Sequence, residues 1–196
     1  MTTVLCVDDN TALAEVLSEL LLSMKFDPHT VPGGTECLAS LKRGEVKPDI
    51  ILLDIMMEPV DGWETLRNIR NDPHLLTIPV VMLTGKYPTM EEVDEFSSLI
   101  DGYLMKPFAI ETVFHEMGVV LDRVRRREDF IDRARRGGAD EHSLQEYRRF
   151  SSCANALKQF QRIMGNGTFR KDSLIIAEEQ LSALERRLMD LGAAVS

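Results

Sequence analysis

The amino-acid sequence predicts an α/β fold: a doubly wound sheet of five parallel strands, followed by an all-helical C-terminal extension. Over about the first 120 residues, short apolar runs alternate with helical patterns. The runs are continuously apolar rather than alternating with polar residues, which is typical of parallel strands covered by helices on both faces. Beyond residue 122 there is no strand-like run, so only helices are expected there.

The expected strands and helices of the first part follow one another in regular order. Strands are expected at residues 4–7, 27–31, 49–54, 79–84 and 102–105. Helices are expected at residues 12–24, 35–41 and 63–70, and from a capping box at Thr89 and Glu92 towards Leu99. Crossovers between parallel strands are right-handed, and ligands bind beyond the carboxyl ends of the strands.

Three helices are expected in the C-terminal part. The first starts near Ile110 and continues through an arginine-rich stretch to the glycines at 137–138. The second is expected to open with a capping box at Ser143 and Glu146 and to end at the glycines around residue 165. The third runs from about residue 173 to 191. Its apolar residues recur at alternating steps of three and four, which indicates a coiled-coil-type seam: Leu174, Ala177, Leu181, Leu184, Leu188 and Leu191.

The composition excludes several classes of protein. With 44% hydrophobic and 28% charged residues, the chain of 196 residues is expected to be globular rather than disordered. No apolar run approaches the ~18 residues of a membrane span, and the N-terminus lacks the basic region of a signal peptide. The three cysteines form no CxxC pair, so a disulfide scaffold or a cysteine zinc site is not expected, and the cytoplasm is the expected compartment.

The net charge of −9 is unevenly distributed along the chain. Residues 1–121 contain 8 Lys/Arg against 20 Asp/Glu, a balance of −12. Residues 122–196 contain 15 Lys/Arg against 12 Asp/Glu, a balance of +3. The sequence therefore consists of an acidic body and a mildly basic tail.

Carboxylates follow two of the expected strands. Asp8 and Asp9 come directly after the first strand, and Asp54 ends the third. If these strands are neighbours, the three carboxylates meet at one edge of the sheet, where a cation would relieve their repulsion. Oxygen ligands suit Mg²⁺ better than zinc, which favours His or Cys. The alternative, a solvated acidic loop, stays open for the Asp8–Asp9 pair taken alone.

A hydroxyl and an ammonium group lie at the ends of the fourth and fifth expected strands. Thr84 ends the fourth strand and Lys106 follows the fifth. A phosphoryl group on one carboxylate would need a hydrogen-bond donor and a cation for its oxygens, and carboxylates are established phosphoryl acceptors. By itself Lys106 could be an ordinary surface lysine, but four strand ends converging on one chemistry favour a phosphoryl site.

The four segments that carry these residues are VLCVDDN, ILLDIMMEPVDGWETL, VVMLTG and GYLMKPF. They resemble the receiver domain of response regulators, the phospho-acceptor module of two-component signalling. The resemblance covers residue 1 to about residue 122 and implies a flavodoxin-like fold with the strand order 2-1-3-4-5.

The resemblance implies a role for each residue of the site. Asp54 would accept a phosphoryl group from a phosphohistidine of a sensor histidine kinase. Mg²⁺ would be held by Asp8, Asp9, Asp54 and the backbone carbonyl of Met56. Thr84 and Lys106 would bind the phosphoryl oxygens, with little covalent work left to the protein.

The resemblance also implies three residues that would regulate the site. Tyr103 matches the aromatic residue whose rotamer follows the movement of Thr84 in this family, although a half-buried strand aromatic is an equally good interpretation. Met56 and Lys86 occupy positions that border the path of the attacking water. They are expected to tune the rate of dephosphorylation, in a direction that the sequence does not give.

The predicted domains are the receiver at 1–122, an arginine-rich helical linker at 123–138 that continues its last helix, and a helical output module at 139–196. The favoured output is protein interaction, through a hairpin or a homodimer that uses the seam of Leu174, Leu181, Leu184 and Leu188. The alternative is nucleic-acid binding, to DNA or as an RNA antiterminator-like tail. An enzymatic output is least expected, because the tail is short and has no clustered catalytic residues.

The arginine-rich stretch is relevant to the nucleic-acid-binding alternative. Residues 123–136 contain seven arginines, which could meet phosphate backbones. A solvated helix with ion pairs such as Arg125–Asp129 is the favoured interpretation, because no aromatic platform accompanies the arginines and the net charge of the tail is only +3.

Overall fold

A computed structural model describes residues 1–165, 169 and 171–193, with side chains to residue 190. Packing divides the chain into two compact units. The first unit contains Met1–Tyr87 and Gly102–Leu121, and the second contains Pro88–Asp101 and the chain from Asp122 onward. The segment between the fourth and fifth strands thus belongs to the helical unit, whereas the domain boundaries drawn from the sequence stay a prediction.

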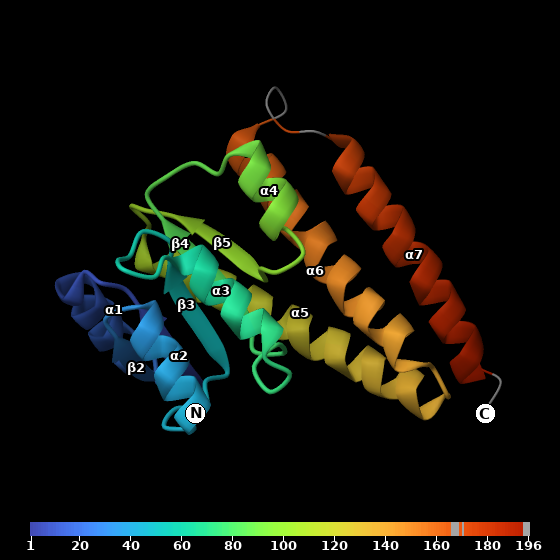
Figure 1. Ribbon diagram of the computed structural model, residues 1–196, viewed down its shortest axis with the longest axis horizontal. Coiled ribbons are helices and arrows are strands. Elements are labelled where there is room, and N and C mark those ends of the chain that lie inside the picture. Colours follow the sequence, from blue (N-terminus) through green and yellow to red (C-terminus); the bar gives the residue numbers. More distant parts are fainter. Residues whose placement is uncertain (166–168, 170, 194–196) are drawn as a thin grey trace. The chain divides into compact units, whose positions relative to one another are not determined.

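The first unit is built on a five-stranded, all-parallel sheet (Figure 1). Its strands are β1 (Thr3–Val7), β2 (Asp27–Val31), β3 (Ile50–Asp54), β4 (Val80–Thr84) and β5 (Gly102–Met105). Their spatial order is β2-β1-β3-β4-β5, which confirms the predicted fold class. Every residue of β3 and β4 is buried, as their continuous apolar runs predict.

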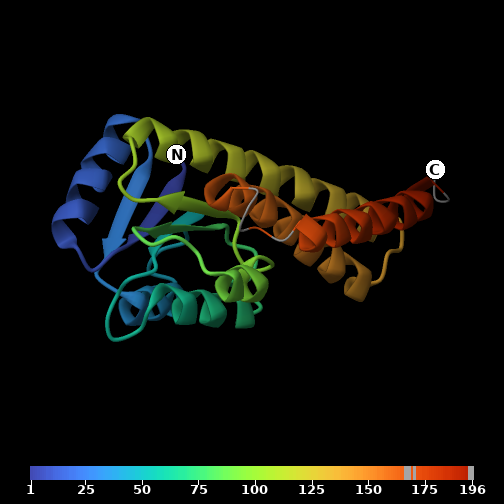
Figure 2. The same cartoon turned by 90° about the horizontal axis from the view of Figure 1, so that it is seen from above.

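Helices cover both faces of this sheet. They are α1 (Thr11–Ser23), α2 (Gly34–Arg43), α3 (Gly62–Asn71) and the first part of α5 (Ile110–Arg136). Figure 2 shows α1 and α5 on one side of the strands and α2 and α3 on the other. The rings of Phe26 and Phe114 stack with their centroids 5.9 Å apart, which fixes the start of α5 on the first face.

The second unit is helical. It contains α4 (Met90–Phe96), the second part of α5, α6 (Glu141–Met164) and α7 (Lys171–Ala193). The predicted capping box opens α4, because Thr89 and Glu92 exchange their side-chain and backbone hydrogen bonds. No helix among the described residues is long and apolar enough to cross a bilayer.

The leucine seam of α7 packs inside the chain. A core cluster joins α5, α6 and α7, and its buried members are Ile131, Ala134, Leu144, Tyr147, Leu184 and Leu188. Leu174 is also buried, and Leu181 packs against the cluster. Within the described residues the seam thus serves the hairpin of α6 and α7, while the side chain of Leu191 lies outside them.

The predicted cap of α6 is wrong. Asp140 is the N-cap, and its carboxylate accepts a hydrogen bond from the backbone N–H of Ser143 at 2.9 Å. Ser143 lies within the first turn and its hydroxyl donates to the same carboxylate at 2.7 Å. Both Asp and Ser are good N-caps, and the position closer to the preceding glycines is the one used.

A buried ion pair holds the helical unit together. The guanidinium of Arg127 on α5 lies 3.2 Å from Oδ1 of Asp101, and both side chains are 6% exposed. The same guanidinium donates to the hydroxyl of Ser152 on α6 at 2.6 Å. By contrast Arg125 is exposed and pairs with Asp122 at 2.8 Å, not with the expected Asp129. The arginine-rich stretch therefore contains both a structural and a solvated face.

Candidate phosphoryl and metal site

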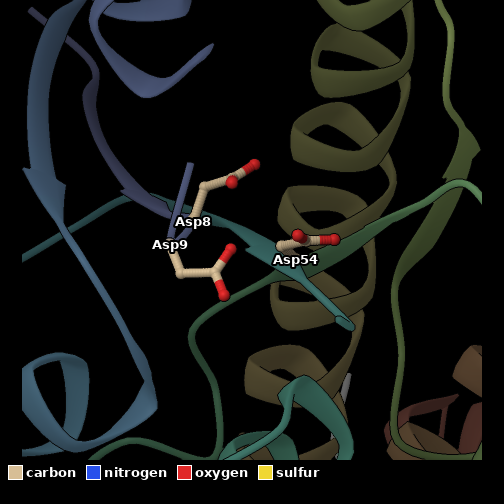
Figure 3. A group of neighbouring side chains, drawn as sticks. All are labelled: Asp8, Asp9 and Asp54. Carbon is tan, nitrogen blue, oxygen red and sulfur yellow. The ribbon is translucent and has the colours of Figure 1, made fainter. Parts of the chain in front are cut away.

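Strand register brings the acidic residues together. Val7 of β1 is paired with Leu53 of β3, so the residues that follow, Asp8 and Asp54, lie side by side beyond the strand ends. One carboxylate oxygen from each of Asp8, Asp9 and Asp54 can be chosen so that all three lie within 4.8 Å of one another. Figure 3 shows the three side chains close to one another at this edge of the sheet.

A lysine reaches the same cluster from β5. The carbonyl of Thr84 accepts the backbone N–H of Lys106 at 2.6 Å, which fixes Lys106 beside the end of β4. Its Nζ lies 2.7 Å from Oδ2 of Asp8 and 3.2 Å from Oδ2 of Asp54. The geometry thus places one ammonium among three carboxylates, which leaves the cluster with an excess of negative charge.

The Asp54 carboxyl is incompletely satisfied. It is 5% exposed, and its Oδ1 accepts no hydrogen bond from the described residues. Burial raises the pKa of this carboxyl above its usual value; Lys106 lowers it, and the negative charge of Asp8 raises it again. A buried carboxylate with an unpartnered oxygen is costly unless a ligand completes its contacts.

The donor set fits Mg²⁺. All three side chains supply hard oxygen ligands, two of them buried and that of Asp9 exposed, so solvent can reach the cluster. No cysteine or histidine belongs to the group, which argues against a zinc site. Met56 follows Asp54 by two residues and its side chain is 61% exposed, so the loop after β3 lies at the surface of the site.

Thr84, Lys86 and Tyr103 form a chain of hydrogen bonds beside the acids. The buried hydroxyl of Thr84 accepts the backbone N–H of Lys86 at 3.1 Å. The phenol of Tyr103 donates to the backbone carbonyl of Lys86 at 3.2 Å. Tyr103 is only 3% exposed and thus points inward in this structure. The backbone at Lys86 therefore touches both proposed switch residues, while its side chain is exposed.

Two residues that the sequence analysis did not single out support this arrangement. The ring of Trp63 stacks on Tyr103 with the centroids 6.5 Å apart, and Trp63 is itself buried. Gly62 allows α3 to begin close to the acceptor strand, since a Cβ at this position would lie 2.1 Å from the carbonyl oxygen of Asp54. The Asp-Gly-Trp run marks these positions in the sequence, but their contacts depend on the packing of α3 against β3 and β5.

Comparisons with known proteins agree with this geometry. A family model described as the response regulator receiver domain matches residues 4–117. The DNA-binding response regulator MtrA of Mycobacterium tuberculosis is 36% identical over 126 residues, covering 64% of this chain and 52% of that protein. The DNA-binding dual master transcriptional regulator RpaA of Synechocystis is 31% identical, with the same coverage. The chain spans about half the length of these curated relatives.

Solved structures show the same likeness over the first part of the chain. The N-terminal domain of a response regulator receiver protein from Methanoculleus marisnigri is 42% identical with a TM-score of 0.51, covering 62% of this chain and 97% of that one. The chemotaxis protein CheY4 of Vibrio cholerae is 29% identical with a TM-score of 0.56, covering 61% and 98%. Since the family model matches more than half of the residues, the chain belongs to the response regulator receiver family of two-component systems.

Proposed function

We propose that this chain accepts a phosphoryl group on Asp54 from a phosphohistidine of a sensor histidine kinase, in a Mg²⁺-dependent reaction. The observation that carries the proposal is the buried Oδ1 of Asp54, which accepts no hydrogen bond from the described residues and belongs to a cluster of excess negative charge. An oxygen of this kind is available as a nucleophile, while Oδ2 is held by Lys106 at 3.2 Å.

Asp8, Asp9 and Asp54 would hold the metal ion, with the backbone carbonyl of Met56 as a further ligand. When bound, Mg²⁺ supplies positive charge that neutralises the charge developing on the phosphoryl oxygens. The side chains of the protein contribute by their positions: Asp54 is the acceptor, and Thr84 and Lys106 bind the oxygens of the transferred phosphoryl group.

The chemical step is an in-line displacement. Oδ1 of Asp54 forms a bond to phosphorus as the phosphorus–nitrogen bond of the phosphohistidine breaks, and the imidazole leaves with the electron pair. Lys106 carries a cation for the phosphoryl oxygens. The Thr84 hydroxyl accepts its hydrogen bond from Lys86, which leaves its own proton to donate to a phosphoryl oxygen.

Hydrolysis reverses the signal. Water attacks the phosphorus of the acyl phosphate, and the carboxylate of Asp54 leaves with the electron pair. Met56 and Lys86 have exposed side chains and occupy the positions that border the path of the attacking water in this family, so we propose that they tune how easily water reaches the acceptor. We place this self-catalysed cycle in the cytoplasm and propose no separate enzymatic activity for the tail.

Phosphorylation would control the helical tail as a protein-interaction or dimerisation module. The chain runs from Lys86, whose backbone bonds Thr84 and Tyr103, into α4, and from α4 through Asp101 into β5. Asp101 is tied to Arg127 and Ser152 of the helical unit. The segment Pro88–Asp101 belongs to the helical unit, and it is flanked in sequence by Lys86 and Tyr103. A shift of Thr84 towards a phosphoryl group would therefore move the chain at both ends of this segment.

A nucleic-acid-binding output is the second candidate, because the matched relatives MtrA and RpaA are named as DNA-binding. Against it, only Arg126, Arg133 and Arg136 of the seven arginines make no hydrogen bond or ion pair with the described residues. Fluorescence anisotropy of the full chain against labelled DNA and RNA at stated salt distinguishes the two outputs. Salt-dependent binding that is lost on exchanging those three arginines for glutamine would favour nucleic acid.

The phosphorylation itself is tested with acetyl phosphate as a small-molecule donor. Intact-protein mass spectrometry should show one added phosphoryl group in the presence of Mg²⁺ and none with EDTA. Asp54→Asn should abolish the addition. Asp49→Asn is the matched control, since Asp49 precedes the same strand at its opposite end and should leave labelling unchanged. Undiminished labelling of Asp54→Asn would overturn the proposal.

A further inference from the structure

Helix α7 carries a second regular pattern on a face that the leucine seam does not use. Its members recur at alternating steps of four and three, which aligns them along one side of a helix. All five are exposed, and we call them the outer stripe: Ile175, Glu179, Ser182, Arg186 and Met189. The two apolar ends, Ile175 and Met189, are 52% and 58% exposed.

The outer stripe of one copy is complementary to the same stripe of a second copy that runs in the opposite direction. In order it is apolar, acidic, small, basic and apolar, with Ser182 at its centre. An antiparallel pairing about a two-fold axis at Ser182 places Ile175 opposite Met189, and Glu179 within one residue, about 1.5 Å along the axis, of Arg186 of the second copy. A parallel pairing would instead place like charges together. Glu179 and Arg186 form no ion pair with the described residues of their own chain, so both charges are available.

We infer that the outer stripe is a docking surface for a second copy of this chain, with the two α7 helices antiparallel. This names a partner for the helical module of the proposed function, and only its link to signalling rests on that function. The surface differs from the seam of Leu174, Leu181, Leu184 and Leu188, which packs within one chain.

A hollow at one end of the outer stripe gives the pairing an anchor. It has a volume of about 360 Å³ and is lined by Phe130, Arg133, Ala134, Leu188 and Met189. Because Met189 is opposite Ile175 of the second copy, that isoleucine lies at the mouth of the hollow. The two-fold axis creates two such contacts in each dimer.

The contact is short, which determines its strength. Residues 175–189 span about 21 Å at about 1.5 Å per residue, and one helix pair of this length buries less than the roughly 1,200 Å² of stable interfaces. The dimer is therefore transient and depends on protein concentration. It can be detected by a method that traps the pair, or by an equilibrium method at high protein concentration.

Cysteine cross-linking at the axis provides such a trap. Ser182→Cys places two thiols opposite each other at the two-fold axis, and mild oxidation with diamide should convert most of the chain to a disulfide-linked dimer. Gln180→Cys is the control, because residue 180 is exposed on the same helix but lies off the stripe. Unmodified protein reports any linkage through Cys153, which is partly buried. Equal linkage at 182 and 180 would overturn the inference.

Charge reversal tests the predicted pairing independently of the introduced thiol. In analytical ultracentrifugation, Glu179→Arg alone and Arg186→Glu alone should each dimerise less than the unmodified chain. An equal mixture of the two variants should form heterodimers, because every Arg then faces a Glu. Both variants should keep the helical circular dichroism spectrum, since both residues are exposed. A mixture that associates no better than its components would contradict the antiparallel arrangement.

These outcomes are separable from the phosphorylation chemistry. Each α7 variant is also labelled with acetyl phosphate, and labelling of Asp54 should equal that of the unmodified chain. Loss of dimers with normal labelling identifies the docking surface, whereas unchanged dimers with no labelling would refute the proposed function alone.

Discussion

The chain contains two clusters of partly buried charge, and they are built in opposite ways. In the receiver site, the carboxylates of Asp8, Asp9 and Asp54 lie together, and the ammonium of Lys106 pairs with two of them, Asp8 and Asp54. In the helical unit, Asp101 and Glu128 are matched by two guanidiniums. Arg127 bonds both acids, and Arg148 binds Glu128 through two hydrogen bonds of 3.1 and 2.6 Å.

This difference in charge balance distinguishes a site that can bind ligands from a network that stabilises the fold. Burial raises the pKa of Asp54, and one lysine does not reverse the effect. Burial also acts to raise the pKa of Glu128, but the hydrogen bonds and charges of Arg148 and Arg127 outweigh it, so that this pKa is lowered. A charge surplus with an unpartnered oxygen leaves room for ligands, whereas a balanced network holds helices in place.

Removing one guanidinium from the balanced network should give the largest loss of stability. Arg127→Ala removes the guanidinium that pairs with the buried carboxylate of Asp101, and breaking a buried pair in this way costs about 3–5 kcal/mol. Arg125→Ala breaks an exposed pair and should cost about 0–1 kcal/mol. Urea unfolding followed by circular dichroism measures both. Similar losses for the two variants would mean that the Arg127 network contributes no more than a surface pair.

Adding a cation should stabilise the unbalanced cluster and leave the balanced one unaffected. Mg²⁺ at ten times its dissociation constant should stabilise the folded receiver by about 1.4 kcal/mol, since binding to the native state adds RT ln(1 + [L]/Kd). Thermal melts with Mg²⁺ and with EDTA measure the gain. Asp9→Asn should reduce it, while Asp49→Asn should preserve it. Equal gains in these two variants would place the cation elsewhere.

Neutralising one acid in each cluster should change stability in opposite directions. The pKa of Glu128 is lowered on folding, so its charge stabilises the protein above its ordinary pKa, and this stability is lost as the pH falls through the folded value. Glu128→Gln should therefore cost about 1–2 kcal/mol at pH ~7, a penalty that fades on acidification.

Asp54 behaves in the reverse manner because its pKa is raised. Its carboxyl is best tolerated when protonated, and that stability is lost as the pH rises through the folded pKa. Without Mg²⁺, Asp54→Asn should raise the melting temperature at pH ~7, and the gain should shrink as the pH falls towards the ordinary value of 3.8. Thermal melts of Glu128→Gln and Asp54→Asn across a range of pH measure both effects. If both substitutions changed the melting temperature at pH ~7 in the same direction, the proposed difference between the two clusters would be wrong.

The two clusters also differ in how far the sequence predicts them. Asp8, Asp54, Thr84 and Lys106 each lie at or directly after the end of a strand, and parallel register brings strand ends together without regard to side-chain detail. The order of the strands in the sheet is predicted from the family resemblance, not from periodicity. Periodicity and strand position therefore predict the strands and the residues at their ends, and the resemblance supplies the strand order that brings these ends together.

The contacts of the helical network cannot be predicted from hydrophobic periodicity. Asp101, Arg127 and Ser152 come from three separate elements, and their meeting depends on the rotation of α5 and α6 about their axes. Periodicity places a residue along a helix only to within about one turn. For this reason the predicted cap at Ser143 and the predicted partner of Arg125 are both wrong. Stacking of Trp63 on Tyr103 likewise needs the packed structure.

Localisation of the phosphoryl group tests the role of the unbalanced cluster most directly. After labelling with acetyl phosphate and Mg²⁺, borohydride reduces an acyl phosphate to the corresponding alcohol, and peptide mass spectrometry identifies the residue converted. Conversion of Asp54 alone, absent when EDTA replaces Mg²⁺, is the predicted result. Conversion at Asp8 or Asp9, or conversion of Asp54 that persists without Mg²⁺, would contradict it.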